Sequence, residues 1–267
     1  AIGEIDRIKA LDNCSFYSSN LIQQRCKKGS IYELGDGVSV NPESFLNLDI
    51  DLVTISGFNQ LPPWAQRANH VGCKSLRIWE WREPNPLGRA EWIIAFGYLS
   101  NRVEEAKKEF SEELKRYKEL LALIQGGGKR IFAGDEFQGI WYCPGGNSFL
   151  ANLFSQAGME YVFNGDTSVG SISLKAESAI EKLSGADAWI YHGRCESIKC
   201  LLEQESRLSF ARDRILSNVW APIKKKTSYG ANKFWEDAIV YPSTLLKDYI
   251  TIAEDLPENT TYYQKLE

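Results

Sequence analysis

The chain has 267 residues, of which 43% are hydrophobic and 25% are charged, a composition that excludes disordered, collagen-like and coiled-coil rod proteins. Its 31 Lys and Arg against 35 Asp and Glu leave a net charge of −4, which disfavours a dedicated nucleic-acid binder because such proteins are usually basic. The longest apolar run, residues 92–99, is less than half of the roughly 20 residues that a membrane-spanning helix needs, so no span is predicted.

The first hundred residues are predicted to alternate between helices and strands. Apolar spacing and helix start signals predict helices at residues 18–27, 43–48, 62–71 and 86–99, and apolar β-branched runs predict strands at residues 51–56 and 75–81. Strands separated by helices favour parallel sheets and the α/β class.

The most regular segment is residues 101–125. One apolar stripe at spacings of three and four predicts a helix there, formed by Val103, Ala106, Phe110, Leu114, Tyr117, Leu121 and Ile124. Gly126-Gly127-Gly128 ends the pattern. About 24 residues at ~1.5 Å each give roughly 36 Å, the length of a small domain. A helix of this length is a stiff connector, so two lobes that move little relative to each other are expected.

Beyond this helix the alternation resumes. Strands are predicted at residues 129–133, 161–163, 186–191 and 217–221, and helices at residues 147–157, 173–183, 196–203, 205–212, 234–238 and 243–254. We therefore predict an α/β fold of two Rossmann-like lobes with parallel sheets joined by one long rigid helix. The N-terminal lobe is expected at residues 1–100, the connecting helix at 101–127 and the C-terminal lobe at 128–267.

Motifs for catalysis are largely missing from the chain. Gly126-Gly127-Gly128-Lys129 lacks the Walker spacing, and there is no G-x-G-x-x-G after a strand, no G-x-S-x-G and no H-E-x-x-H. Only His70 and His192 could serve Ser-His or Cys-His catalysis, and no pair of carboxylates stands out. An enzyme therefore has little support from the sequence.

The six cysteines leave two interpretations open. They contain no C-x-x-C and have only two histidines to join them, which disfavours a structural zinc site. An even number permits three disulfides in an oxidising compartment, whereas buried free thiols are an equally good interpretation.

Polar and aromatic clusters follow several predicted strands, at the edge where α/β folds bind ligands. They are residues 79–83, 138–142 and 191–194, together with Trp220 and the Lys224–Lys226 run. In a two-lobed protein these loops are expected to face one cleft. The alternative is that each Trp packs at the edge of its own lobe and each Arg is solvated.

Four stretches resemble a known family. Residues 42–55 (P-E … D-L-V-T-I), 83–92 (E-P-N-P-L-G-R-A-E-W), 139–148 (G-I-W-Y-C-P-G-G-N-S) and 234–248 (F-W-E … P-S-T-L-L-K-D) are similar to motifs of the substrate-binding proteins of ABC importers for iron-siderophores, haem and cobalamin. The resemblance runs over nearly the whole chain, although no motif specifies the ligand. In the family a strand and a helix precede the stretch that matches residues 3–8, so we expect either a sequence trimmed ahead of this stretch or an N-terminal lobe that lacks this strand and helix.

The resemblance implies an extracytoplasmic protein, periplasmic or anchored to a membrane by a lipid ahead of this chain. It implies a monomer that captures a metal-chelate small molecule between its lobes and delivers it to the permease of an ABC importer. No catalytic residue, resident cofactor, protein metal site or nucleic-acid partner is expected, while the transported ligand can contain Fe or Co. Glu43 and Glu177 match the family's permease-docking acids, and the alternative is that both are ordinary solvated helix acids.

Family position and strand ends together predict the ligand-binding residues. They are Tyr17, Asn59, Trp81, Arg82, Gln138, Trp141, Tyr142, Arg194, Trp220 and Tyr229. Aromatic side chains suit haem or cobalamin, whereas Arg82, Arg194 and the lysine run suit a negatively charged ferric siderophore. Axial ligation of haem would fall to Tyr191 or His192. A two-lobed α/β enzyme and a ligand sensor with the same fold are the two alternative functions.

Overall fold

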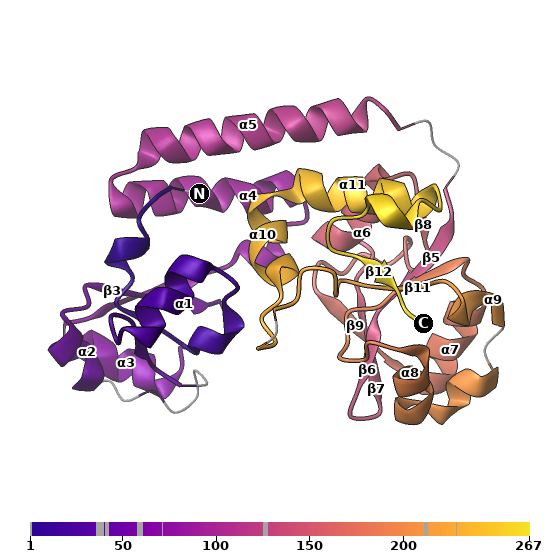
Figure 1. The fold of residues 1–267 in the computed structure, drawn as a ribbon, viewed down its shortest axis with the longest axis horizontal. Helices are drawn as coiled ribbons and strands as arrows, with labels where there is room; N and C mark the ends of the chain where they lie inside the picture. Colours follow the sequence, from indigo (N-terminus) through magenta and orange to yellow (C-terminus); the bar gives the residue numbers. More distant parts are fainter. Residues whose placement is uncertain are drawn as a thin grey trace. The chain divides into compact units, whose positions relative to one another are not determined.

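The computed structural model describes residues 2–35, 40, 43–57, 61–70, 72–124, 128–210, 213–227 and 229–267. Two compact units divide the chain (Figure 1). Unit 1 consists of residues 1–80 with 226–232, and unit 2 consists of residues 81–225 with 233–267. Each unit contains parallel strand pairs and helices, so the predicted α/β class with parallel sheets is confirmed.

Unit 1 is built on short parallel strand pairs. β1 (Ala10–Leu11) pairs with β2 (Tyr32–Glu33), and β3 (Leu52–Ser56) pairs with β4 (Lys74–Ile78). The helices of this unit are α1 (Asn20–Lys27), α2 (Glu43–Leu48) and α3 (Pro63–His70). Phe45 and Trp64 lie with ring centroids 6.1 Å apart in one small core, and the Cys14–Cys26 disulfide lies in a second. A core this small gains from a covalent link.

Unit 2 contains a five-stranded sheet in the order β12-β11-β10-β5-β8. The strands are β5 (Arg130–Ala133), β8 (Glu160–Tyr161), β10 (Ala188–Ile190), β11 (Val219–Ala221) and β12 (Gln264–Lys265). All pairs are parallel except β11–β12, which is antiparallel. The three strands that the sequence predicts near residues 130, 188 and 219 form the centre of this sheet.

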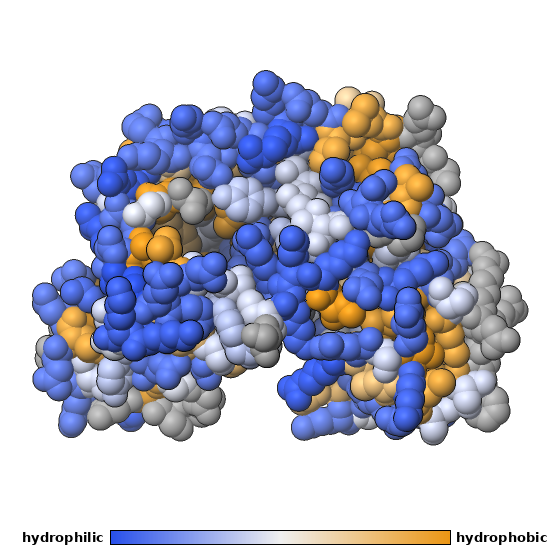
Figure 2. All heavy atoms as spheres, in the orientation of Figure 1, coloured by the Kyte–Doolittle hydropathy of each residue, from blue (hydrophilic) through white to orange (hydrophobic). Residues whose placement is uncertain are grey.

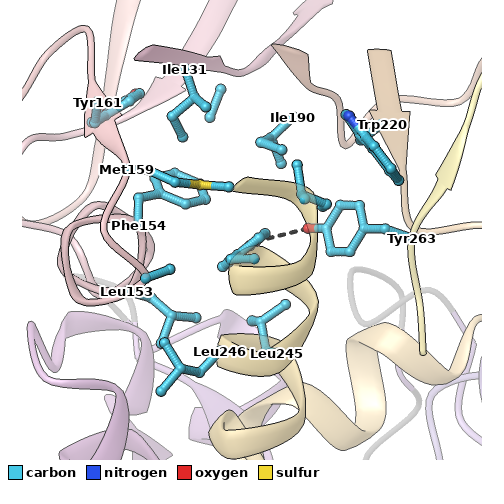
Figure 3. Packing of buried hydrophobic residues seen from close by; sticks show 14 of the residues in the cluster. Ile131, Leu153, Phe154, Met159, Tyr161, Ile190, Trp220, Leu245, Leu246 and Tyr263 are labelled. Atoms are coloured by element: carbon cyan, nitrogen blue, oxygen red, sulfur yellow. Dashed lines mark hydrogen bonds between the residues drawn. The ribbon is translucent and has the colours of Figure 1, made fainter. Parts of the chain in front are cut away.

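Both faces of that sheet are covered by helices. Along β5, Ile131 and Ala133 face one apolar cluster while Phe132 faces another. The first cluster, shown in part in Figure 3, is covered by α6 (Phe149–Gln156) and α11 (Pro242–Ala253). The second is covered by α7 (Ala176–Ser184). A strand buried on both faces reads as a continuous apolar run, which is why sequence patterning finds these strands.

A three-stranded antiparallel sheet was not predicted. It consists of β6 (Asp135–Phe137), β7 (Ile140–Pro144) and β9 (Ser171–Lys175). Gln138 and Gly139, both with positive φ, form the two-residue turn between β6 and β7. The helix predicted at residues 173–183 is wrong at its beginning, because β9 runs to Lys175 and α7 begins at Ala176.

Unit 2 begins with two successive long helices. They are α4 (Pro86–Ser100) and α5 (Val103–Leu121), so α5 is shorter at both ends than the predicted 101–125. Asn101 adopts φ 58° at the junction, and a Cβ added at Gly97 would lie 2.6 Å from the Ala106 Cβ. Glycine therefore permits the close packing of α4 against α5. The remaining helices are α8 (Ile198–Gln204), α9 (Asp213–Leu216) and α10 (Lys233–Val240).

A buried carboxylate joins α5 to α11. Glu113 is only 1% exposed, and its carboxylate accepts the Ser243 backbone N–H at 2.6 Å and the Ser243 hydroxyl at 2.9 Å. The Arg116 Nε also donates to it at 3.1 Å. Ser243 lies in the first turn of α11, so the carboxylate satisfies a helix N-terminal donor and complements the helix dipole.

Replacement of Glu113 by Ala is expected to lower the free energy of unfolding by about 2–4 kcal/mol, because two Ser243 donors would be left buried without an acceptor. The neighbouring Glu112→Ala removes an exposed carboxylate 3.9 Å from Arg116 and should cost at most about 0.5 kcal/mol. Urea denaturation of both variants measures the difference. Equal stabilities for the two variants would show that the Glu113 contacts do not anchor α11.

Candidate functional site

The strand order of unit 2 creates a topological switch point. From β5 the chain crosses through α6 to β8 on one side, and later returns through α7 to β10 on the other side of β5. In doubly wound sheets of this order, ligands bind outside the carboxyl ends of the two strands where the direction reverses. The candidate site in unit 2 is therefore the edge where β5 and β10 end, which we call the switch-point edge.

Asp135 begins β6, two residues beyond the end of β5 at this edge. Its side chain is half-buried and forms no hydrogen bond with any residue that the structure describes. Burial, and then the neighbouring Glu136, raise the pKa of the Asp135 carboxyl to about 6. An acid with a perturbed pKa at a ligand-binding edge is a functional candidate. Sequence reasoning missed Asp135, although its position two residues after a buried strand was a usable signal.

The loop after β10 is held in one conformation. The Tyr191 hydroxyl accepts the Cys195 backbone N–H at 3.1 Å, and a Cβ added at Gly193 would lie 2.2 Å from that hydroxyl oxygen. The Cys195–Cys200 disulfide then links the loop to α8. Tyr191 is 1% exposed, so it supports the loop and does not present its hydroxyl at the surface.

The predicted site residues of unit 2 fall into two groups. Arg82, Gln138, Tyr142 and Arg194 are exposed, and Trp81 is half-buried with its ring centroid 6.0 Å from the Arg82 guanidinium carbon. Trp141 and Trp220 instead lie in the core. Trp141 packs with its ring centroid 5.6 Å from that of Trp189, on the opposite face of the sheet from Trp220.

Two predicted residues meet in unit 1. The Tyr229 hydroxyl donates to the backbone oxygen of Tyr17 at 3.3 Å, and the Tyr17 hydroxyl donates to Asp12 Oδ1 at 2.9 Å. Residues 226–232 thus return to unit 1 from a distant part of the chain. Asn59 lies outside the residues that the structure describes.

The two predicted docking acids begin helices. Glu43 is exposed in the first turn of α2, and Glu177 is exposed in the first turn of α7. Arg207 Nη1 lies 2.7 Å from Glu177 Oε1, while the same guanidinium donates two further hydrogen bonds, at 2.8 and 2.7 Å, to the buried Glu205. A shallow pocket of about 360 Å³ lies beside this ion pair and is lined in part by Ile140 and Leu174.

The distribution of apolar side chains on the visible surface does not by itself identify a binding site. Figure 2 shows hydrophilic side chains over most of the visible face, with apolar side chains exposed in separate patches. Exposed aromatic and aliphatic residues on unit 2 include Phe137, Ile140 and Trp235. Among the described residues, no helix is both long and apolar enough to cross a membrane.

The cysteines divide between the two predicted interpretations. Cys14–Cys26 and Cys195–Cys200 form disulfides, whereas Cys73 and Cys143 are buried free thiols. In the part of the chain that the structure describes, no three His, Cys, Asp or Glu side chains are placed to hold a metal ion.

The fold is similar to that of solved binding proteins over nearly the full chain. A periplasmic haem-binding protein from Pseudomonas aeruginosa matches 100% of this chain and 92% of its own, with a TM-score of 0.71 and 14% identity. The haem-binding protein HutB of Vibrio cholerae matches with a TM-score of 0.66, 16% identity and 92% coverage of both chains. The vitamin B12-binding protein BtuF of Vibrio cholerae matches with a TM-score of 0.60, 15% identity, and 96% and 91% coverage.

Sequence relatives match a smaller part of this chain. Two uncharacterized lipoproteins of Methanocaldococcus jannaschii are 22% and 23% identical over 63% and 61% of this chain, and the matches span 41% and 44% of those relatives, less than half of their length. No family model matches the chain. The structural likeness confirms the predicted resemblance at the level of the fold: the chain has the two-lobe α/β fold of these haem- and B12-binding proteins.

Replacing Asp135 with Asn is expected to raise the free energy of unfolding by about 1–2 kcal/mol at pH 7.5, allowing for solvent screening of a half-exposed group. Because the folded-state pKa is about 6 and lies above the unfolded value, the folded protein binds the extra proton between about pH 4 and 6, and ionisation destabilises it above that range. The advantage of the Asn variant should therefore vanish near pH 4.

Urea denaturation at pH 4 and pH 7.5 measures this difference, with the exposed Glu91→Gln on α4 as the matched control. An Asp135→Asn variant that is no more stable than the parent at pH 7.5 would refute the destabilising carboxylate.

Proposed function

We propose that this chain, which shares its fold with periplasmic haem- and B12-binding proteins, is the substrate-binding component of an ABC importer and captures a metal-chelate small molecule. The observation that carries the proposal is the fold likeness over 92–100% of the chain to proteins described as binding such ligands. The scarcity of catalytic motifs in the sequence agrees with a binding role. The switch-point edge supplies a place on unit 2 where this fold class binds ligands.

Among the ligands of that class, the exposed side chains favour an anionic ferric chelate. Arg82 and Arg194 are exposed and lie beside strand ends, where a guanidinium can bind carboxylate or catecholate oxygens. Lys224 is engaged by Thr260, whose hydroxyl lies 2.6 Å from its Nζ. Lys225 and Lys226 are exposed as well, so the two arginines and these lysines are the basic groups that we assign to such a ligand.

The aromatic residues give less support to a haem ligand. Trp141 and Trp220 are buried in the core with Trp189, which leaves the half-buried Trp81 and Trp92 and the exposed Trp235 as the other tryptophans of unit 2. Tyr191 accepts a backbone hydrogen bond and is buried, so it is not free to ligate a haem iron. We infer that Tyr17, Tyr142, Gln138 and Tyr229 supply further polar and stacking contacts to the ligand.

We further propose that Glu43 and Glu177 dock the protein on arginines of its permease. Both acids are exposed and lie in the first turn of a helix, one in each unit. Arg207 holds Glu177 in one position, which reduces the side-chain entropy lost on docking. Exposed acids of this kind contribute to orientation and association rate more than to affinity.

The cellular location follows from the same proposal. Relatives are described as lipoproteins, and two disulfides suit an oxidising compartment. We infer that the protein works outside the cytoplasm, anchored to the membrane by a lipid.

The purified protein is expected to retain an anionic ferric tris-catecholate at unit stoichiometry after desalting, and to retain haem and cobalamin less. Arg82→Ala and Arg194→Ala should each lower the affinity for this chelate about tenfold, equivalent to about 1.4 kcal/mol of binding free energy. The affinity of each variant should also depend less on salt concentration than that of the parent protein. Absorbance, native mass spectrometry and isothermal titration measure these effects.

Arg102→Ala is the control, because Arg102 is exposed but lies between α4 and α5, away from the switch-point edge. If the protein retained only haem or only cobalamin, that compound, and not the anionic chelate, would be the ligand. Failure to retain any of these compounds would argue against the binding role.

A further inference from the structure

A hydrogen-bonded chain leads from the core of unit 2 to the switch-point edge. The Tyr249 hydroxyl lies 2.8 Å from the Tyr263 hydroxyl, which lies 2.7 Å from His192 Nε2. Tyr249 and Tyr263 are completely buried, whereas His192 is partly exposed in the loop after β10. In Figure 3 the dashed line marks the bond at the Tyr263 hydroxyl, which points toward α11.

The proton arrangement in this chain follows from counting donors and acceptors. Among the described residues, the Tyr249 hydroxyl has the Tyr263 hydroxyl as its one hydrogen-bond partner. If Tyr249 donates to Tyr263, then Tyr263 donates to His192 Nε2 and every buried hydroxyl proton is used. Nε2 is then an acceptor, so the neutral imidazole carries its proton on Nδ1.

The reverse arrangement leaves a buried donor unsatisfied. If His192 donated from Nε2, Tyr263 would have to donate to Tyr249, and the Tyr249 proton would have no acceptor in an apolar core. Leaving a buried donor unsatisfied costs the full desolvation penalty of that group. The same argument disfavours the doubly protonated imidazolium, whose Nε2 also carries a proton.

The surroundings of the ring favour the neutral form as well. The imidazole stacks on Phe234 at 5.6 Å with an interplanar angle of 21°, and burial lowers the pKa of His192 to about 4. The acids of α10 are Glu236 and Asp237, and the acid of α11 is Asp248. The imidazole is hydrogen-bonded to Tyr263 and to none of these acids, and the Asp248 carboxylate accepts the backbone N–H groups of residues 261 and 262 at 2.6 and 2.7 Å.

The second ring nitrogen is available. No residue that the structure describes forms a hydrogen bond with His192 Nδ1, and the ring lies beside Trp235, which is 57% exposed. Nδ1–H is therefore a hydrogen-bond donor on a partly exposed ring that buried groups hold in place. It lies just after β10, at the edge where this fold class binds ligands.

We propose that the Tyr249–Tyr263 pair holds His192 as the neutral Nδ1–H tautomer, and that His192 donates this hydrogen bond to an oxygen atom of an oxygen-rich anionic ligand. Tyr249 and Tyr263 are positioning residues and His192 is a ligand contact. Nε2 is occupied by Tyr263, so His192 does not coordinate a metal ion through that atom. The ligand contact rests on the proposed binding function, whereas the tautomer does not.

The tautomer is tested by ¹⁵N NMR of the imidazole side chains. The chain contains only His70 and His192, so His70→Gln assigns both signals. We expect His192 to be protonated at Nδ1 and to stay neutral from pH 8 to about pH 5.

Tyr263→Phe should shift the population toward Nε2–H and raise the His192 pKa. Tyr262→Phe is the matched control, because Tyr262 is equally buried and does not bond to His192. An Nε2–H tautomer in the parent protein would overturn the proposal.

The ligand contact is tested with a ferric tris-catecholate, which carries a net charge of about 3−, as the probe. His192→Asn places an amide N–H near the position of Nδ1–H and should keep affinity within about threefold, whereas His192→Phe should lose about tenfold. Tyr263→Phe should lose affinity with little change in melting temperature. Equal affinities for the Asn and Phe variants would overturn the ligand contact while leaving the binding function intact. No binding of any chelate by the parent protein would overturn the binding function and the ligand contact together.

Discussion

Burial of both faces of one short parallel sheet is the constraint on which unit 2 depends. β5, β10 and β11 are covered on each side, with alternate residues in opposite clusters. Such strands must be enclosed by helices on both faces, and right-handed crossovers then place β8 and β10 on opposite sides of β5. The switch point follows from that order. The candidate site is thus a consequence of how the core is covered, rather than of any catalytic motif.

Polar groups inside this core fix elements that are distant in sequence. Glu113 joins α5 to α11, and the fully buried Asp248 carboxylate accepts backbone N–H groups of the C-terminal segment. That segment then supplies β12 and Tyr263. Because each of these groups is satisfied, removing one partner leaves a buried donor or acceptor alone. The same segment that completes the sheet thereby sets the environment of His192.

The fold and the function have different kinds of support. The fold is shown by likeness over 92–100% of the chain, at sequence identities of 14–16%. At such identities ligand specificity is free to diverge, since function depends on a few side chains at the site. Under the proposed function, the exposed arginines and the His192 imidazole distinguish an anionic chelate from a macrocycle. The lobe boundaries at residues 100 and 128 stay a prediction.

The sequence by itself determined the α/β class, most helices, and the central strands of unit 2, because these depend on local apolar periodicity that adjacent residues carry. It also placed Arg82 and Arg194 at strand ends. It could not separate Trp141 and Trp220, which are buried, from Arg82 and Arg194, which are exposed, since burial depends on segments far along the chain. It could not find the β6–β7 hairpin or choose between free thiols and disulfides. Only the tertiary structure brought Tyr263 to His192 across 71 positions, because no local pattern encodes a contact between residues that distant.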